Sequence, residues 1–206
     1  MAAFLGNLRN VIIVSLLLAI GMIVAFGKLS PQGFDRVFWE AVLRWIHVFF
    51  GILWIGLLYY FNFVAARKTP EIPAELRPAL TKYITPEALF WFRWGALFTV
   101  LAGISVAALR GNEYAENVFT FGLAGGYGPS KHGYTLMGIG IYLAIIMFLN
   151  VWGVIWPNQK RALGIVEADA DTKAKSARIA GQASRINVLL SLPMLTSMAM
   201  YQSLFG

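Results

Sequence analysis

The chain of 206 residues has no cysteine and few charged residues. Without cysteine it has no disulfides, thiolate metal sites, iron–sulfur clusters or covalently attached c-type haem. Charged residues make up 13% of the sequence and hydrophobic residues 58%, whereas roughly a quarter of the residues of a soluble domain are charged. This composition predicts an integral membrane protein.

Ionisable groups are also scarce within the apolar stretches, and none of them places a carboxylate at the membrane centre. Proton pumps and cation-coupled transporters usually need such carboxylates, so the sequence argues against both classes. The chain has two histidines, which without cysteine or a buried carboxylate cannot form a stable non-haem metal site. We expect Asn150 and Asn187, near the ends of apolar stretches, to bridge helices.

Five apolar stretches are long enough to cross a bilayer, whose core requires about 20 helical residues. We therefore predict an all-α membrane bundle that forms a single domain over residues 1–206. The predicted transmembrane helices cover residues 10–27, 38–65, 88–109, 134–156 and 187–204. The first stretch is predicted to be an uncleaved anchor rather than a signal peptide, because only Arg9 precedes it and its apolar run is long.

The lysines and arginines predict the orientation of this bundle. Most of them lie in the N-terminal segment and in the second and fourth loops, which share one side of the membrane. The positive-inside rule then places the N-terminus in the cytoplasm and the C-terminus in the periplasm of a bacterial inner membrane. The net charge of +7 fits this bias, so membrane lipid is expected as a partner and nucleic acid is not.

His47 is an ionisable residue inside the second predicted helix, where such residues usually mark a function. Arg44 lies three residues before it and Gly51 four residues after it, so all three share one helix face. An imidazole can bind haem iron, a glycine lets a flat macrocycle approach, and an arginine can pair with a propionate. His132, the other histidine, lies just before the fourth helix on the same side of the membrane.

The same three residues can also be explained by helix packing, without a cofactor. His47 can form a hydrogen bond with a neighbouring helix, and Gly51 can be a packing position between helices. Arg44 can extend its side chain to the lipid head groups. The spacing alone does not choose between this interpretation and a haem site.

Four segments carry more specific motifs. They are Arg44-Trp45-Ile46-His47 with Gly51, Trp54-Ile55-Gly56 and Phe61; Trp91-Phe92-Arg93-Trp94 with Gly103; Asn150-Val151-Trp152-Gly153-Val154-Ile155-Trp156-Pro157-Asn158-Gln159-Lys160; and Ser184-Arg185-x-Asn187 with Leu190-Ser191-Leu192-Pro193-Met194-Leu195. In this order they resemble the membrane domain of bacterial cytochrome-c-linked urate oxidase. The resemblance covers about residues 38–205.

This resemblance implies a helical membrane domain that bears haem b and passes electrons from purine oxidation to a cytochrome c domain. The chain departs from the family pattern in several places. It has no Cys-x-x-Cys-His motif, which implies a standalone form without the fused cytochrome c. Gly138, Ile186 and Gln202 stand where family members tend to carry histidines, and His132 lies outside those positions.

The loss of these histidines favours an accessory or electron-transfer subunit of a larger membrane complex. We expect it to work with other membrane subunits rather than as an enzyme on its own, and to bind one haem b through His47 or none. The candidate cofactor-binding residues are His47, Arg44, Gly51 and His132, with His47 as the ligand of the haem iron. The alternative is a free-standing, urate oxidase-like oxidoreductase that passes electrons to a separate cytochrome c.

Overall fold

The computed structural model describes residues 2–125 and 130–205, and these residues form helices and turns without a β-strand. This confirms the all-α prediction. The elements in chain order are α1 (Ala2–Leu5), α2 (Leu8–Leu29), α3 (Arg36–Tyr59), the π-helical η1 (Tyr60–Ala65), α4 (Ala66–Lys68), the 3₁₀ turn η2 (Thr69–Glu71), α5 (Arg77–Ala79), the π-helical η3 (Leu80–Ile84), α6 (Thr85–Leu109), α7 (Asn112–Phe119), α8 (Ser130–Asn150), the π-helical η4 (Val151–Ile155), α9 (Trp156–Ala162) and α10 (Ala170–Leu204).

Four helical runs are long and apolar enough to cross a membrane: Leu8–Leu29, Arg36–Glu71, Arg77–Leu109 and Lys131–Ala162. They contain the first four predicted spans, which supports a membrane protein. The fifth predicted span, residues 187–204, lies in α10 and is not among them. Its serines and Gln202 lower its hydropathy, so five spans are not confirmed, and the orientation stays a prediction.

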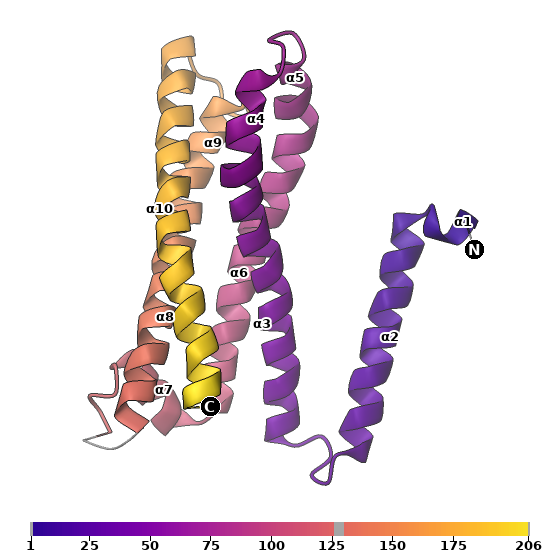
Figure 1. Cartoon of the computed structure of the whole chain (residues 1–206), viewed down its shortest axis with the longest axis vertical. Coiled ribbons are helices and arrows are strands. Elements are labelled where there is room, and N and C mark those ends of the chain that lie inside the picture. Colours follow the sequence, from indigo (N-terminus) through magenta and orange to yellow (C-terminus); the bar gives the residue numbers. More distant parts are fainter. Residues whose placement is uncertain (1, 126–129, 206) are drawn as a thin grey trace.

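The bundle is formed by α3, α6, α8 and α10, whereas α2 stands apart from it (Figure 1). Only Gly27 of α2 is buried, where the helix turns towards α3. A β-carbon at Gly27 would lie 2.6 Å from the rings of both Phe34 and Phe38, so glycine lets the connection fold tightly. The rest of α2 exposes apolar side chains, which suits direct contact with lipid acyl chains.

The fourth loop differs from expectation. The predicted spans leave residues 157–186 as a loop in which the Ala-rich segment 167–177 suits a surface helix, but from Ala170 onward these residues are the first half of the continuous 35-residue α10. Asp169 caps this helix, because its carboxylate accepts hydrogen bonds from the Thr172 backbone N–H at 2.7 Å and the Thr172 hydroxyl at 2.8 Å. These hydrogen bonds lower the pKa of Asp169.

Two of the π-helical segments lie just before a proline. η3 ends two residues before Pro86 and η4 ends two residues before Pro157. Proline has no backbone N–H and its ring clashes with the carbonyl four residues earlier, so a wider turn accommodates it within a continuous helix. The spans therefore extend beyond the predicted boundaries at both prolines.

Side-chain amides hold α8 to α10, as predicted for Asn150 and Asn187. Asn150 donates to the Asn187 side-chain oxygen at 2.7 Å and to the Ala183 carbonyl at 2.8 Å. The fully buried Asn187 donates in turn to the Met147 carbonyl at 3.0 Å. Because every amide in this chain of contacts finds a partner, the polar groups can lie inside an apolar bundle.

Replacing Asn187 with alanine removes both the donor and the acceptor of this bridge. We expect a loss of about 1 kcal/mol in the free energy of unfolding, the size of interhelical hydrogen bonds in membranes. The matched control is Asn158→Ala, because Asn158 donates only to Val154 within its own helical run. Unfolding in detergent micelles by a chemical denaturant measures both changes, and equal losses would contradict the bridge.

Candidate functional site

His47 lies on the face of α3 that contacts α6. Its Nδ1 is 2.8 Å from the backbone carbonyl of Thr99. A carbonyl oxygen only accepts, so Nδ1 carries the proton and the Nε2 of the neutral ring keeps its lone pair. The Thr99 hydroxyl donates to the Gly95 carbonyl at 2.7 Å and does not compete for this contact.

Gly103 makes room for the imidazole. A β-carbon at this position would lie 2.9 Å from both Cε1 and Nδ1 of His47, closer than real β-carbons approach other atoms. Gly103 lies one turn from Thr99, and Thr99 one turn from Gly95. Small residues at four-residue intervals are a recognised signal for close helix packing, so the spacing of these three residues could have predicted this contact.

Gly51 is brought to the same contact as His47. A β-carbon there would lie 3.8 Å from the Thr99 methyl group, which is ordinary van der Waals contact. The nearest neighbour on this side of Gly51 is thus helix α6. This agrees with the structural interpretation of Gly51, in which the glycine serves helix packing rather than the approach of a macrocycle.

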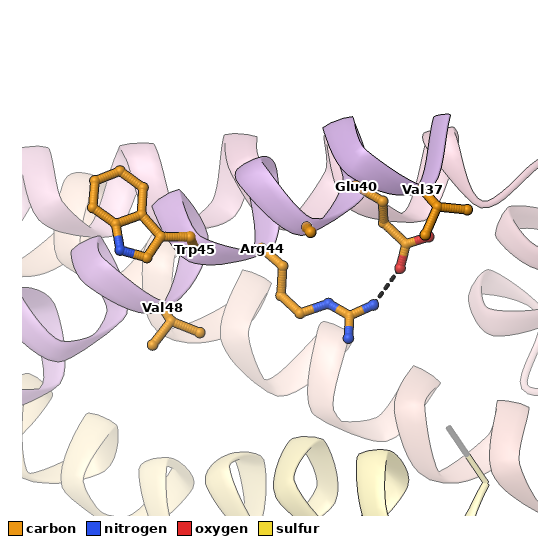
Figure 2. Close-up of a pocket in the computed structure, with 6 residues that line it drawn as sticks. Val37, Glu40, Arg44, Trp45 and Val48 are labelled. Carbon is orange, nitrogen blue, oxygen red and sulfur yellow. Dashed lines mark hydrogen bonds and ion pairs between the residues drawn. The ribbon is translucent and has the colours of Figure 1, made fainter. Parts of the chain in front are cut away.

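Arg44 lies one turn before His47 and forms an ion pair with Glu40 (Figure 2). Its second guanidinium nitrogen donates to the Gln202 side-chain oxygen of α10 at 3.0 Å. Arg44 and Glu40 also line a hollow of about 390 Å³ on one face of α3, whose other lining residues are Val37, Ala41, Trp45 and Val48. Arg44 therefore joins two helices beside an open hollow.

Arg110 completes this charged cluster from the end of α6. Its Nε donates to Glu40 at 2.8 Å, and its Nη1 donates to the Tyr201 hydroxyl at 3.2 Å. Burial opposes the charge of Arg110, but the bonds to Glu40 and the contact with Tyr114 outweigh it and raise the pKa of Arg110. Burial, together with Tyr201, likewise raises the pKa of Tyr114. Two arginines thus share one carboxylate, which leaves an excess positive charge.

His132 is not part of this arrangement. It lies in the first turn of α8 with its side chain exposed. Among the described residues it forms no hydrogen bond with His47, and no three or more metal-binding side chains come together. The structure thus assembles His47, Arg44 and Gly51 on α3 and does not bring the second histidine to them.

The three positions at which the family tends to carry histidines lie in different surroundings. A β-carbon at Gly138 would clash with the Val118 carbonyl, so no larger side chain fits there. Ile186 is 52% exposed. Gln202 accepts a hydrogen bond from Arg44, a contact between residues 158 positions apart that the sequence did not predict.

No match to the chain is found among protein-family models, curated proteins or solved structures. The resemblance to the urate oxidase membrane domain therefore stays a prediction based on the motifs themselves.

Replacing Gly103 with alanine tests the packing of His47. The added methyl group must displace the imidazole from Thr99, so we expect a loss of about 1–3 kcal/mol in the free energy of unfolding. In a His47→Ala background most of this loss should disappear, because the ring is no longer in the way. A double-mutant cycle in detergent micelles measures the coupling.

Gly56→Ala is the matched control for this cycle, because a β-carbon at Gly56 meets no atom within 4 Å. We expect it to be neutral or slightly stabilising, since alanine favours helices over glycine. Additive effects of Gly103→Ala and His47→Ala would contradict the proposed packing.

Replacing Glu40 with glutamine tests the charged cluster. Both arginines lose their carboxylate, and we expect a loss of at least about 1.5 kcal/mol, the lower value for a hydrogen bond to a charged group. Glu71→Gln is the control, because Glu71 and its partner Lys68 are 62% and 65% exposed. Such exposed pairs contribute less than about 1 kcal/mol. Thermal unfolding of both variants should separate them, and a Glu40→Gln protein as stable as the control would refute the role.

Proposed function

We propose that the chain is an accessory or electron-transfer subunit of a larger membrane complex, in which Nε2 of His47 binds the iron of one haem b. The main support is the hydrogen bond from Nδ1 of His47 to the Thr99 carbonyl. Histidines that bind metals commonly donate their other ring N–H to a carbonyl or carboxylate, which fixes the tautomer and the ring orientation. The donor chemistry of His47 therefore fits a ligand of haem iron.

The charged cluster supports the same assignment. Arg44 and Arg110 share the single carboxylate of Glu40, so the cluster can accept a further negative charge. A haem propionate offers such a charge, and arginine binds carboxylates through charge-assisted hydrogen bonds. His47 would hold the iron and Arg44 would anchor a propionate. A bound haem would supply one-electron redox chemistry.

A second function for His47 is favoured by its contact with α6. The imidazole is seated on Gly103 and bonded to Thr99, which is sufficient to hold α3 against α6 without a cofactor. In that case the chain is a subunit that contributes helices to a complex and carries no electrons. The two functions predict different spectra for the purified protein.

The visible absorption spectrum of the full chain, purified from cells supplied with haem, distinguishes them. We expect a Soret band that is lost in His47→Ala and retained in His132→Ala, because we propose His47 alone as the ligand of the iron. Circular dichroism confirms that both variants remain helical. A colourless, folded wild-type protein would eliminate the haem and leave the packing role.

Urate-dependent reduction of added cytochrome c tests the alternative of a free-standing oxidoreductase. We expect no reduction by the isolated chain, since a subunit needs its partner proteins. Reduction that requires His47 would overturn the assignment as a subunit and favour the free-standing enzyme.

A further inference from the structure

A second cluster of cations lies where α6 meets η4 and α9. The Arg93 guanidinium carbon is 3.8 Å from the centre of the Trp156 ring, and the Lys160 ammonium nitrogen is 5.8 Å from the same centre. Arg110 directly follows α6 and lies 17 residues after Arg93, which corresponds to about 25 Å at 1.5 Å per residue. The Arg93 cluster is therefore far from the charged cluster beside His47.

The cations of this cluster lack anionic partners. The ion pairs of the described residues involve only Glu40 and Glu71, so neither Arg93 nor Lys160 has a carboxylate within 4 Å. Nη1 of Arg93 is buried and has no hydrogen-bond partner. Buried donors are nearly always satisfied in proteins, so this one calls for an acceptor.

A second unsatisfied donor lies at the same helix contact. Nε1 of Trp152 is buried without an acceptor. Its ring packs edge-on against Trp94, with the ring centres 5.7 Å apart, and Trp94 is the neighbour of Arg93 in the chain. Helix α6 thus contributes the donor and charge of Arg93, and the η4–α9 run contributes the Trp152 donor and the Lys160 charge. Neither element supplies an acceptor for the two unsatisfied donors.

We propose that this cluster binds the phosphodiester headgroup of an anionic phospholipid. Phosphate oxygens accept charge-assisted hydrogen bonds from arginine and lysine. Tryptophans are typical of the membrane interface, and basic pockets between transmembrane helices at the cytoplasmic side bind anionic head groups. The loop charges predict that this end of the bundle is cytoplasmic. The assignment does not depend on the haem or on His47.

Apolar surface beside the cations favours a lipid over a free phosphate ion. Phe90 contacts the Arg93 guanidinium at 5.5 Å from its ring centre. Phe90 is 41% exposed and Trp91 is 46% exposed. These side chains offer acyl chains a surface next to the headgroup, which a free ion would not need.

Native mass spectrometry of the full chain in detergent, with equal amounts of phosphatidylglycerol and phosphatidylcholine, tests the proposal. We expect one phosphatidylglycerol to be retained preferentially. Each cation should contribute about fivefold to this preference, so Arg93→Gln with Lys160→Gln should lower it roughly 25-fold. The control carries Arg67→Gln and Arg178→Gln, two exposed residues with the same loss of charge, and should keep the preference.

Three results would overturn the proposal. They are equal retention of the two lipids by the wild-type protein, an equal loss in the control variant, and displacement of phosphatidylglycerol by excess inorganic phosphate, which would identify a site for free anions. If the double variant does not fold, the single variant Lys160→Gln can be measured instead. Among the described residues the Lys160 side chain forms no hydrogen bond, and only its backbone carbonyl accepts them. This single variant should lower the preference for phosphatidylglycerol about fivefold, because it removes one cation.

Discussion

The contact between α3 and α6 depends on three small residues that lie one turn apart on α6, namely Gly95, Thr99 and Gly103. Gly95 brings the two backbones together, since a β-carbon there would lie 3.4 Å from the Trp54 backbone nitrogen. Gly103 admits the His47 ring, and Thr99 provides the carbonyl that binds it. Between membrane helices no hydrophobic force acts, so close packing and hydrogen bonds must supply the association. The tautomer of His47, and with it every role proposed for Nε2, follows from this contact.

The charged groups of the bundle divide into two clusters of different character. Near the ends of α3 and α6, Glu40 neutralises part of the charge of Arg44 and Arg110, and Tyr201 and Gln202 of α10 satisfy further donors. At the other end of α6, aromatic rings surround Arg93 and no carboxylate does. The first cluster, Glu40 with Arg44 and Arg110, therefore links helices within the chain and retains one excess positive charge. The positive charge of the second cluster, Arg93 with Lys160, is not neutralised by any carboxylate of the described residues. This difference is why a role between helices, with one charge left for a propionate, suits the first cluster, and a lipid headgroup suits the second.

Much of the fold could be predicted from the sequence, because apolar length is a local property. Four spans were predicted in this way. Asn150 and Asn187 were also expected to bridge helices, because polar residues at the ends of apolar stretches need partners. Helix α10 was harder to predict. Its first half is charged and its second half apolar, so the composition changes within the helix and suggests a boundary where the backbone has none. The partners of His47 and Arg44 could not be predicted, since Thr99 and Gln202 are distant in sequence and only tertiary packing brings them close. The stripe Gly95–Thr99–Gly103 was the one signal in the sequence that could have located the His47 contact.

The same hydrogen bond supports both roles of His47, so the decision between them depends on what lies at Nε2. The bond from Nδ1 to the Thr99 carbonyl uses one of the two ring nitrogens and leaves the lone pair of Nε2 available to a further partner. If His47 only links α3 to α6, the bond from Nδ1 is sufficient and nothing need lie at Nε2. If a haem binds as we propose, Nε2 would hold its iron, and the excess positive charge of Arg44 and Arg110 would attract its propionates. A polar group of another subunit would serve as a partner of Nε2 equally well, and in either case His47 would act through a group outside the chain.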